Sequence, residues 1–332
     1  MVIFMTVTIR EIASYCNVSE GTVDRALNNR TGISSKTKER ILAAAKKLDY
    51  KPNILAQCLA TGSTKTIGVV CGGLSNRFFA SLIEAIGTNA RNNGYFISLV
   101  LSHNSPVKEL EGIHYLARRQ ADGIIIFPVG YGKAYEEELK QLNIPIVTLY
   151  NRISENFTHV DTDCRKIMRE AVKHILLKGY KNIVYMDIKN YSGCTNEDIN
   201  FFSLNERCQG YKEGMEQAGL NCRIVNKYDE NLLISLASAP VRTAILCPYD
   251  VLAIKIVNFY RKIGIQIPSQ IGIMGFDNID MLENITPLIS SVDCNTKKLG
   301  EIAFSILLEK ITGTYTGGDV TVGYSFTEGE SL

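Results

Sequence analysis

Several features that would assign this chain to other classes of protein are missing from its 332 residues. No run approaches the roughly 18 consecutive apolar residues of a membrane-spanning helix, and Met1-Val2-Ile3-Phe4-Met5 is too short an apolar start for a signal peptide. The nine cysteines form no C-x-x-C pair and no disulfide-like cluster, which is typical of reduced thiols in a cytoplasmic protein. The four histidines lack metal-ligand spacing, so we expect no metal site.

The sequence also lacks the phosphate-binding and nucleophile motifs of common α/β enzymes. It contains no G-x-x-x-x-G-K-[ST], no G-x-S-x-G and no G-x-G-x-x-G after a strand, and Cys71-Gly72-Gly73 lacks the last spacing. We therefore expect no enzyme activity and no cofactor. An enzyme remains a rival class, because doubly wound lobes commonly serve dehydrogenases and kinases. Measurable ATP turnover would favour that class.

Three closely spaced helical patterns are present between Thr8 and Tyr50. Thr8-Ile9-Arg10-Glu11 is an S/T-x-x-E capping box, which predicts a helix that starts just after Thr8. Ser19 predicts the N-cap of a second helix, and Ser34 or Ser35 that of a third. Two helices joined by a tight turn and braced by a third are the plan of a helix-turn-helix. The predicted buried stripes are Ile9, Ile12, Ala13 and Cys16, then Val23, Ala26 and Leu27, then Ile41, Leu42, Ala45 and Leu48.

Charge is distributed unevenly between this segment and the rest of the chain. Residues 1–65 hold ten Lys and Arg against five Asp and Glu, which leaves 26 against 29 for the remainder. A basic head on a slightly acidic body is typical of a phosphate-binding module attached to a sensor. The plainer alternative is a solvated helical cap whose positive charge is incidental.

The head closely resembles that of the lac repressor and purine repressor (LacI/GalR) family of bacterial regulators. The resemblance rests on residues 8–13 (TIREIA), 18–28 (VSEGTVDRALN), 32–34 (GIS) and 50–53 (YKPN), and extends through the whole chain. It implies a DNA-binding transcription regulator whose second helix lies in the major groove. Family members often begin just before the capping threonine, so Met5 is an alternative start to Met1. The implied base contacts are Glu20, Gly21 and Arg25, and the implied phosphate contacts are Thr22, Asn28 and Ser34.

Two departures from the family pattern affect DNA reading. Asp24 stands where the family commonly has a serine close to the phosphates, so its carboxylate needs a partner, which we expect to be Arg25, Arg30 or a cytosine amino group. Gly21 has no side chain with which to read a base. Specificity would then depend on Arg25, whose guanidinium suits a guanine edge at about 1–3 kcal/mol of discrimination.

Residues 53–60 resemble the family's hinge helix, which forms on operator DNA and inserts a leucine into the minor groove. Leu59 matches that leucine, and Gln57 stands where many relatives have arginine. An ordinary linker helix is the alternative. Thr61-Gly62-Ser63-Thr64-Lys65 predicts a flexible joint. We thus expect a DNA-binding domain at 1–52, a hinge helix and linker at 53–65, and an effector-binding domain at 66–332.

The body alternates short apolar runs with longer helical patterns, which predicts an α/β fold of two doubly wound parallel-sheet lobes. The predicted strands are residues 67–70, 96–100, 123–127 and 144–149 in one lobe and 183–186, 244–246 and 271–274 in the other. The family body resembles periplasmic sugar-binding proteins, which implies an N-lobe of about 66–163 and 294–332 and a C-lobe of about 164–293. A free solute-binding protein of a transporter is a second rival, disfavoured by the head and the missing export signal.

Effector-binding residues in the N-lobe follow from the same resemblance. Asn76-Arg77-Phe78-Phe79 resembles an Asn-Pro-Phe-Phe motif whose rings, here Phe78 and Phe79, stack on a sugar or base, although Arg77 replaces the proline. Both phenylalanines could instead be core residues at a helix start. Asn151 and Arg152 stand where sugar-binding relatives often have Asp-Arg and would hold ligand hydroxyls. Arg152 could instead only bridge the lobes.

The C-lobe supplies the remaining predicted contacts. Ser203 and Arg207 match a serine and an arginine that bind effector, and Asp277 matches an aspartate that accepts from ligand hydroxyls or ring nitrogens. Tyr249 replaces a usual asparagine, and Tyr228 lies near an aromatic position of the pocket. These phenols, with Cys294 near a common glutamine position, leave room for a flatter or partly apolar ligand.

The resemblance implies a repressor whose operator affinity is controlled allosterically by a sugar or sugar derivative bound between the lobes. The alternative is a corepressor-dependent regulator that binds a purine or another non-sugar metabolite. Two heads joined in a homodimer would read two half-sites of a pseudo-palindromic operator. No heptad tail follows Thr312-Gly313, so we expect a dimer and not a tetramer.

Overall fold

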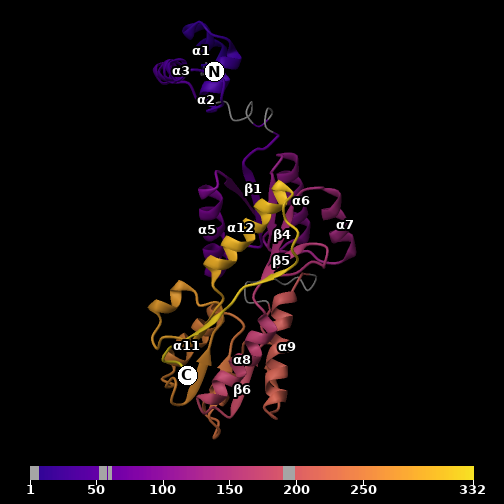
Figure 1. Ribbon diagram of the computed structural model, residues 1–332. Coiled ribbons are helices and arrows are strands. Elements are labelled where there is room, and N and C mark those ends of the chain that lie inside the picture. Colours follow the sequence, from indigo (N-terminus) through magenta and orange to yellow (C-terminus); the bar gives the residue numbers. More distant parts are fainter. Residues whose placement is uncertain (1–6, 52–57, 59–61, 190–198) are drawn as a thin grey trace, which may run out of the picture. The chain divides into compact units, whose positions relative to one another are not determined.

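The computed structural model describes residues 7–51, 58, 62–189 and 199–332. It divides into two units, Met1–Thr64 and Lys65–Leu332 (Figure 1), which are considered separately below. The predicted hinge contacts Gln57 and Leu59 lie outside the described residues. None of the helices in the described part has the length and apolar character needed to span a bilayer.

The first unit contains α1 (Ile9–Cys16), α2 (Glu20–Leu27) and α3 (Ser35–Lys47). The predicted capping box is confirmed: the Thr8 hydroxyl accepts from the Glu11 amide at 3.3 Å, and the Glu11 carboxylate accepts from the Thr8 amide at 2.7 Å. Ser19 and Ser34 cap α2 and α3 through their side-chain hydroxyls. Each cap satisfies a backbone N–H that the helix itself leaves without a partner, so these residues determine where each helix begins.

The core of this unit is small and centred on Ile12, Val23 and Ile41, which are fully buried. The prediction that Leu42 belongs to this core is wrong, because its side chain is 42% exposed. Ile41, Ala44 and Ala45 form the inward face of α3 at the helical spacing i, i+3, i+4. Leu42 is one residue further round the helix and points away.

The first lobe of the second unit has a parallel six-stranded sheet in the order β11-β5-β4-β3-β1-β2, in which β11 is Val320–Thr321 near the end of the chain. Its first strands are β1 (Thr66–Cys71), β2 (Phe96–Leu101), β3 (Gly123–Ile126), β4 (Ile146–Leu149) and β5 (Thr158–Asp161). Alternate residues of β1 face opposite layers: Ile67 and Val69 pack with α5 (Arg77–Asn92), and Val70 packs with α6 (Pro106–Arg118) and α7 (Lys133–Gln141). The prediction of β2 as a buried strand is wrong, because β2 is the sheet edge and Phe96 is 68% exposed.

The second lobe has a parallel four-stranded sheet in the order β7-β6-β8-β9. The strands are β6 (Asn182–Met186), β7 (Arg223–Val225), β8 (Thr243–Leu246) and β9 (Ile271–Met274). Helices α8 (Cys164–Leu177), α9 (Phe202–Gln217), α10 (Glu230–Ala237) and α11 (Asp250–Lys262) alternate with them, and η1 (Asp280–Asn284) follows β9. This alternation of strand and helix is the doubly wound pattern predicted from the sequence.

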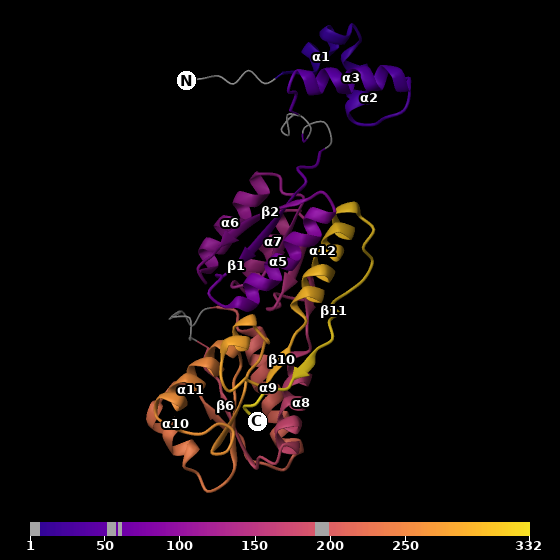
Figure 2. The ribbon, with the colours of Figure 1, turned by 90° about the vertical axis from the view of Figure 1, so that its left-hand side faces the viewer.

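The end of the chain corrects one predicted lobe boundary. We expected residues 294–332 to belong to the first lobe. Helix α12 (Thr296–Thr312) does pack beside α5 (Figure 2), and β11 pairs with β5. The chain then returns to the second lobe, where β12 (Ser325–Thr327) pairs with β10 (Ser291–Asp293) and the Ser331 carbonyl accepts from the Ile273 amide at 2.8 Å.

The tail lies there because its side chains find partners on the second lobe. The Phe326 ring stacks on His174, with centroids 4.9 Å apart, and the Ser331 hydroxyl donates to the Ile273 carbonyl at 2.6 Å. The chain therefore passes between the lobes near residues 161–164, 293–296 and 321–325.

Candidate DNA-reading helix and effector cavity

In the head, α2 presents a polar face to solvent. Glu20, Gly21, Arg25 and Asn28 are accessible along it or at its end, so the predicted contacts on this helix share one side. Thr22 is half-buried, and its hydroxyl lies 2.9 Å from that of Ser19. Ser34 is exposed at the start of α3.

Asp24 is held by two neighbours. The Asn28 side-chain amide donates to one carboxylate oxygen at 2.7 Å, and the Arg30 guanidinium donates to the other at 3.1 Å. Of the partners expected from the sequence, Arg30 is therefore the one present in the isolated head. Its positive charge compensates a carboxylate that would otherwise repel phosphate, and the Asn28 side-chain amide is engaged by the same carboxylate.

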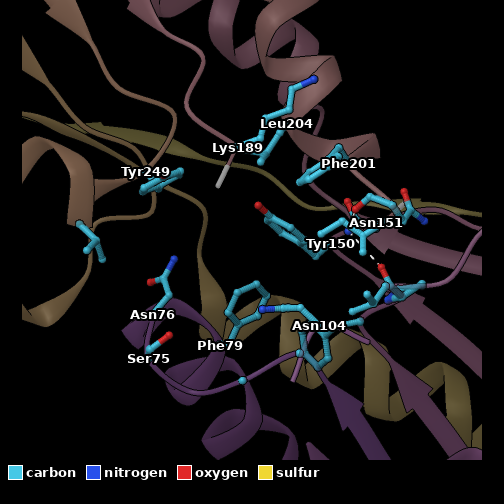
Figure 3. A pocket seen from close by; sticks show the side chains of 18 residues that line it. Ser75, Asn76, Phe79, Asn104, Tyr150, Asn151, Lys189, Phe201, Leu204 and Tyr249 are labelled. Atoms are coloured by element: carbon cyan, nitrogen blue, oxygen red, sulfur yellow. Dashed lines mark hydrogen bonds between the residues drawn. The ribbon is translucent and has the colours of Figure 1, made fainter. Parts of the chain in front are cut away.

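A cavity of about 400 Å³ lies between the two lobes, at the carboxyl ends of their strands (Figure 3). This is the position at which doubly wound sheets bind ligands. Both lobes contribute to its wall. It is lined by Gly72, Gly73, Ser75, Asn76, Phe79, Asn104, Phe127, Pro128, Val129, Tyr150, Asn151, Lys189, Ile199, Asn200, Phe201, Leu204, Tyr249 and Val251.

Aromatic rings form much of this wall. Phe79 packs edge-on against Phe127 and Tyr150, with centroids 5.6 and 5.2 Å apart, while Phe201 and Tyr249 come from the second lobe. The Tyr150 hydroxyl points into the cavity (Figure 3). Tyr150 also has a left-handed backbone (φ 65°), a conformation that bulky residues adopt rarely and that often marks a functional position.

A buried carboxylate supports the first-lobe side of the cavity. Glu109 of α6 accepts from the backbone amides of Val129 and Gly130, at 2.9 and 2.7 Å, and from the Tyr135 hydroxyl at 2.5 Å. Burial raises the pKa of Glu109, while these donors act to lower it. The loop after β3, which lines the cavity, is thus held in place by its hydrogen bonds to Glu109.

Arg207 and Asp277 form a buried ion pair that is not part of the cavity lining. Their charged atoms lie 3.5 Å apart, and the Arg207 guanidinium stacks 3.7 Å from the Phe276 ring centroid and donates to the Pro248 carbonyl. Burial raises the pKa of Asp277 to about 6, although Arg207 acts to lower it. The two charges that we expected to hold the effector are therefore paired with each other, while the Arg207 Nε makes no hydrogen bond within the described residues.

The other predicted effector residues divide between the cavity and its surroundings. Phe79, Asn151 and Tyr249 line it. Phe78 is a core residue, and the Ser203 hydroxyl lies 3.3 Å from the Cys164 sulfur. Elsewhere, Arg152 pairs with Asp319 at 2.6 Å within the first lobe, and the Tyr228 ring packs under the Lys255 ammonium at 3.8 Å.

Sequence reasoning missed several lining residues. Tyr150 directly follows a predicted strand, so its place at a carboxyl strand end was a usable signal. Asn200 and Phe201 precede α9. Phe201 is the N-cap of this helix but makes no side-chain capping bond, so the sequence carries no capping motif that would indicate where α9 begins. Lys189 donates to Asn205 at 2.6 Å, a pairing between segments that no spacing predicts.

Comparison with known proteins assigns the chain to a family. Residues 8–53 match the family described as bacterial regulatory proteins, lacI family, and residues 172–332 match the periplasmic binding protein-like domain. The chain is 30% identical over 315 residues to catabolite control protein A of Priestia megaterium, covering 91% of this chain and 92% of that protein. The chain belongs to the lacI family.

Other members of the lacI family agree with the fold. The HTH-type transcriptional repressor PurR of Photobacterium profundum is 26% identical over 317 residues, covering 92% of each chain. The crystal structure of the lac repressor dimer bound to operator and the anti-inducer ONPF superposes with a TM-score of 0.85 at 20% identity, covering 98% of this chain and 99% of that one. This lacI-family protein is accordingly a DNA-binding transcriptional regulator and not an enzyme.

Proposed function

We propose that this regulator is a cytoplasmic repressor that binds a two-half-site operator as a homodimer and releases it when a small molecule occupies the cavity between the lobes. The observation that carries this proposal is the pairing of two sites in one chain: an exposed polar face on α2 and an aromatic-walled cavity of about 400 Å³. Such a cavity is large enough for a ring-shaped metabolite.

The homodimer is supported by the edge strand β2. Phe96 and Leu99 are both exposed on it, and an apolar strand edge is a surface that a second copy would cover. One small head alone would bind weakly, and a second head raises the effective concentration at the neighbouring half-site.

A sugar or sugar derivative is the first candidate effector, because the family resemblance favours it and aromatic rings stack on the apolar faces of sugars. A purine or another flat metabolite is the second candidate. It is favoured by Phe79, Phe127 and Tyr150 on one side of the cavity and Phe201 and Tyr249 on the other. Engagement of Arg207 and Asp277 with each other leaves fewer charged groups for ligand hydroxyls.

The effector would act by favouring one angle between the lobes. A ligand can shift operator affinity only through its different affinities for the two lobe arrangements, and operator must shift ligand affinity by the same factor. Release by a sugar is the expected direction, and tightening by a corepressor is the alternative.

Thermal melting with a ligand panel tests the effector site. The panel holds sugars, sugar phosphates, polyols, nucleobases and nucleosides, and the variants are Phe79→Leu in the cavity and Leu177→Ala, at an exposed position on α8, as its control. We expect one class to raise the melting midpoint of the wild type and of Leu177→Ala, but not of Phe79→Leu. An equal rise in all three proteins would place the ligand elsewhere.

Selection from randomised duplexes tests operator reading. We expect the enriched sequence to be a pseudo-palindrome, and we expect Arg25→Ala to lose about 1–3 kcal/mol of preference for it while keeping most of its affinity for random DNA. Loss of the same size on both duplexes would mean that Arg25 contacts phosphate and not a base.

A further inference from the structure

Asn151 and Asn200 stand on opposite sides of the gap between the lobes. Asn151 follows β4 of the first lobe, and Asn200 lies just before α9 of the second. Both line the cavity, yet their residues are only 7% and 8% exposed. Their positions make them the buried polar contact between the lobes beside the ligand space.

The two residues are joined by a network of hydrogen bonds. The Asn151 side-chain amide donates to the Asn200 carbonyl at 2.8 Å, and the Asn200 backbone amide donates to the Val129 carbonyl at 2.8 Å. The Asn200 side-chain amide donates to the Arg152 carbonyl at 2.9 Å, and the Ser203 backbone amide donates to the Asn151 side-chain oxygen at 3.0 Å. Each bond links the loops after β3 and β4 to the start of α9.

This network uses both N–H groups of the Asn151 side chain, because the second donates to the Pro128 carbonyl at 3.1 Å. An ionised aspartate at this position has no donor, so it would leave two carbonyls without a partner and place a charge against them. Asparagine at position 151, where sugar-binding relatives often have aspartate, therefore suits a contact to backbone carbonyls. The amide is not free to take ligand hydroxyls.

We propose that Asn151 and Asn200 are positioning residues that tie the lobes together and set the angle between them, so that the effector acts by stabilising or straining this tie. This inference rests on the proposed effector-controlled function. Two other contacts between the lobes differ in character: Asn76, which donates to Asp277 at 3.5 Å, is only half-buried, and the Arg77–Asp280 ion pair is exposed to solvent. The amide network is buried, so water competes less for its hydrogen bonds.

Distance measurements between two spin labels on one protomer, with labelled protein diluted into excess unlabelled protein, test the tie in the full-length protein. Cysteine replaces Glu137 on α7 and Glu216 on α9, both exposed, and serine replaces Cys58, Cys194 and the exposed Cys222. Asn151→Asp breaks the tie by removing both donors. Asn258→Asp, at an exposed position on α11, adds the same charge away from the tie and serves as the matched control.

We expect one narrow distance distribution for the wild type and for Asn258→Asp, and a broader or longer one for Asn151→Asp with unchanged far-ultraviolet circular dichroism. Operator affinity should change by about fivefold or more in the same variant, the scale of coupling between sites. Asn200→Ala, which adds no charge, is the second variant should Asn151→Asp fail to fold. The distance distribution and operator affinity of the double variant should differ little from those of either single variant, because both substitutions break the same hydrogen-bond network.

A wild-type distribution in both Asn151→Asp and Asn200→Ala would overturn the tie. So would a changed distribution with no change in operator affinity. Failure of the proposed function is distinguishable, because the wild type would then bind no selected duplex whatever the distances between its lobes.

Discussion

Asp24 illustrates at the scale of one residue how a chain keeps a carboxylate on a surface that meets phosphates. The side chain does not stand alone, since Arg30 and Asn28 both donate to it. An exposed ion pair of this kind is worth little to stability, about 0–1 kcal/mol. Its importance is for binding, because it decides how much positive charge the head offers to DNA.

We therefore expect Arg30→Gln to weaken binding to any duplex, because it removes a cation and leaves the Asp24 carboxylate uncompensated. In an Asp24→Ser background the same substitution should reduce DNA affinity less. Binding titrations of the wild type, the two single variants and the double variant at several salt concentrations give the comparison, with the salt slope falling by about one for each lost phosphate contact. Equal losses in both backgrounds would mean that Arg30 acts independently of Asp24.

Asp277 carries a pH dependence that follows from its burial. Its folded-state pKa of about 6 lies above the ordinary value of 3.8, so between these values the folded protein binds more protons than the unfolded chain. Stability linked to this group is present below pH 4 and lost as pH rises through 6, by at most about 3 kcal/mol. Urea unfolding from pH 4 to 7 should show this fall in wild type and a smaller one in Asp277→Asn. A rise in wild-type stability relative to the variant over this range would contradict the assignment.

At the scale of elements, the close approach of α12 to α5 depends on Gly300. A β-carbon at this position would lie 2.7 Å from the Ala85 β-carbon and 3.0 Å from the Ile86 backbone nitrogen. The two helices could accommodate this β-carbon only by moving apart. That movement would also disturb their packing on the face of the first-lobe sheet that they cover.

Gly300→Ala should therefore destabilise the second unit by about 1–3 kcal/mol through overpacking. Gly87→Ala, on α5, is the control, because its β-carbon would meet only Ile97 at 3.4 Å and alanine favours a helix by about 1 kcal/mol over glycine. Urea unfolding monitored by circular dichroism compares them. A neutral Gly300→Ala would mean that the helices separate freely.

The helices and strands differ in how well the sequence predicts them. Strands with continuous apolar runs, such as β3 and β8, were predicted because burial on both faces leaves that signature. Strands β7 and β12 were missed, since each is three residues long and is defined by a distant partner. The head was predicted down to its caps because capping is local chemistry.

The cavity residues likewise divide into those with a local sequence signal and those placed by tertiary structure. Phe79 was expected from a motif, whereas Asn200 reaches the cavity only because the lobes close on it. Resemblance also suggested charges in the pocket at Arg207 and Asp277, but the pairing of these side chains is a tertiary fact that no spacing encodes.

On the scale of the second unit, one exposed contact also joins the two lobes. Arg77 at the start of α5, which replaces a proline of the family motif, donates two hydrogen bonds to Asp280 of η1 in the opposite lobe. Because this pair is solvent-exposed, dissolved salt screens it, whereas the buried tie at Asn151 is shielded.

We expect the lobe-to-lobe distance distribution of the wild type to broaden as sodium chloride is raised. The distribution of Arg77→Gln should be slightly broader than that of the wild type at low salt, because the Asn151 tie is still present, and should respond little to further addition of salt. Lys178→Gln, which breaks an exposed pair with Glu328 at 2.7 Å inside the second lobe, is the control and should behave as wild type. The same spin-label pair reports all three proteins, and full salt sensitivity in Arg77→Gln would exclude this contact as its source.

The returning tail has a mechanical consequence. Two bodies joined by a single strand of chain can turn freely about it, but bodies joined near residues 161–164, 293–296 and 321–325 cannot twist without stretching one connection against another. The lobes can still open and close by bending about the axis that passes through the three connections. Binding or release of a ligand in the cavity should therefore change the opening angle between the lobes, and should not twist one lobe relative to the other.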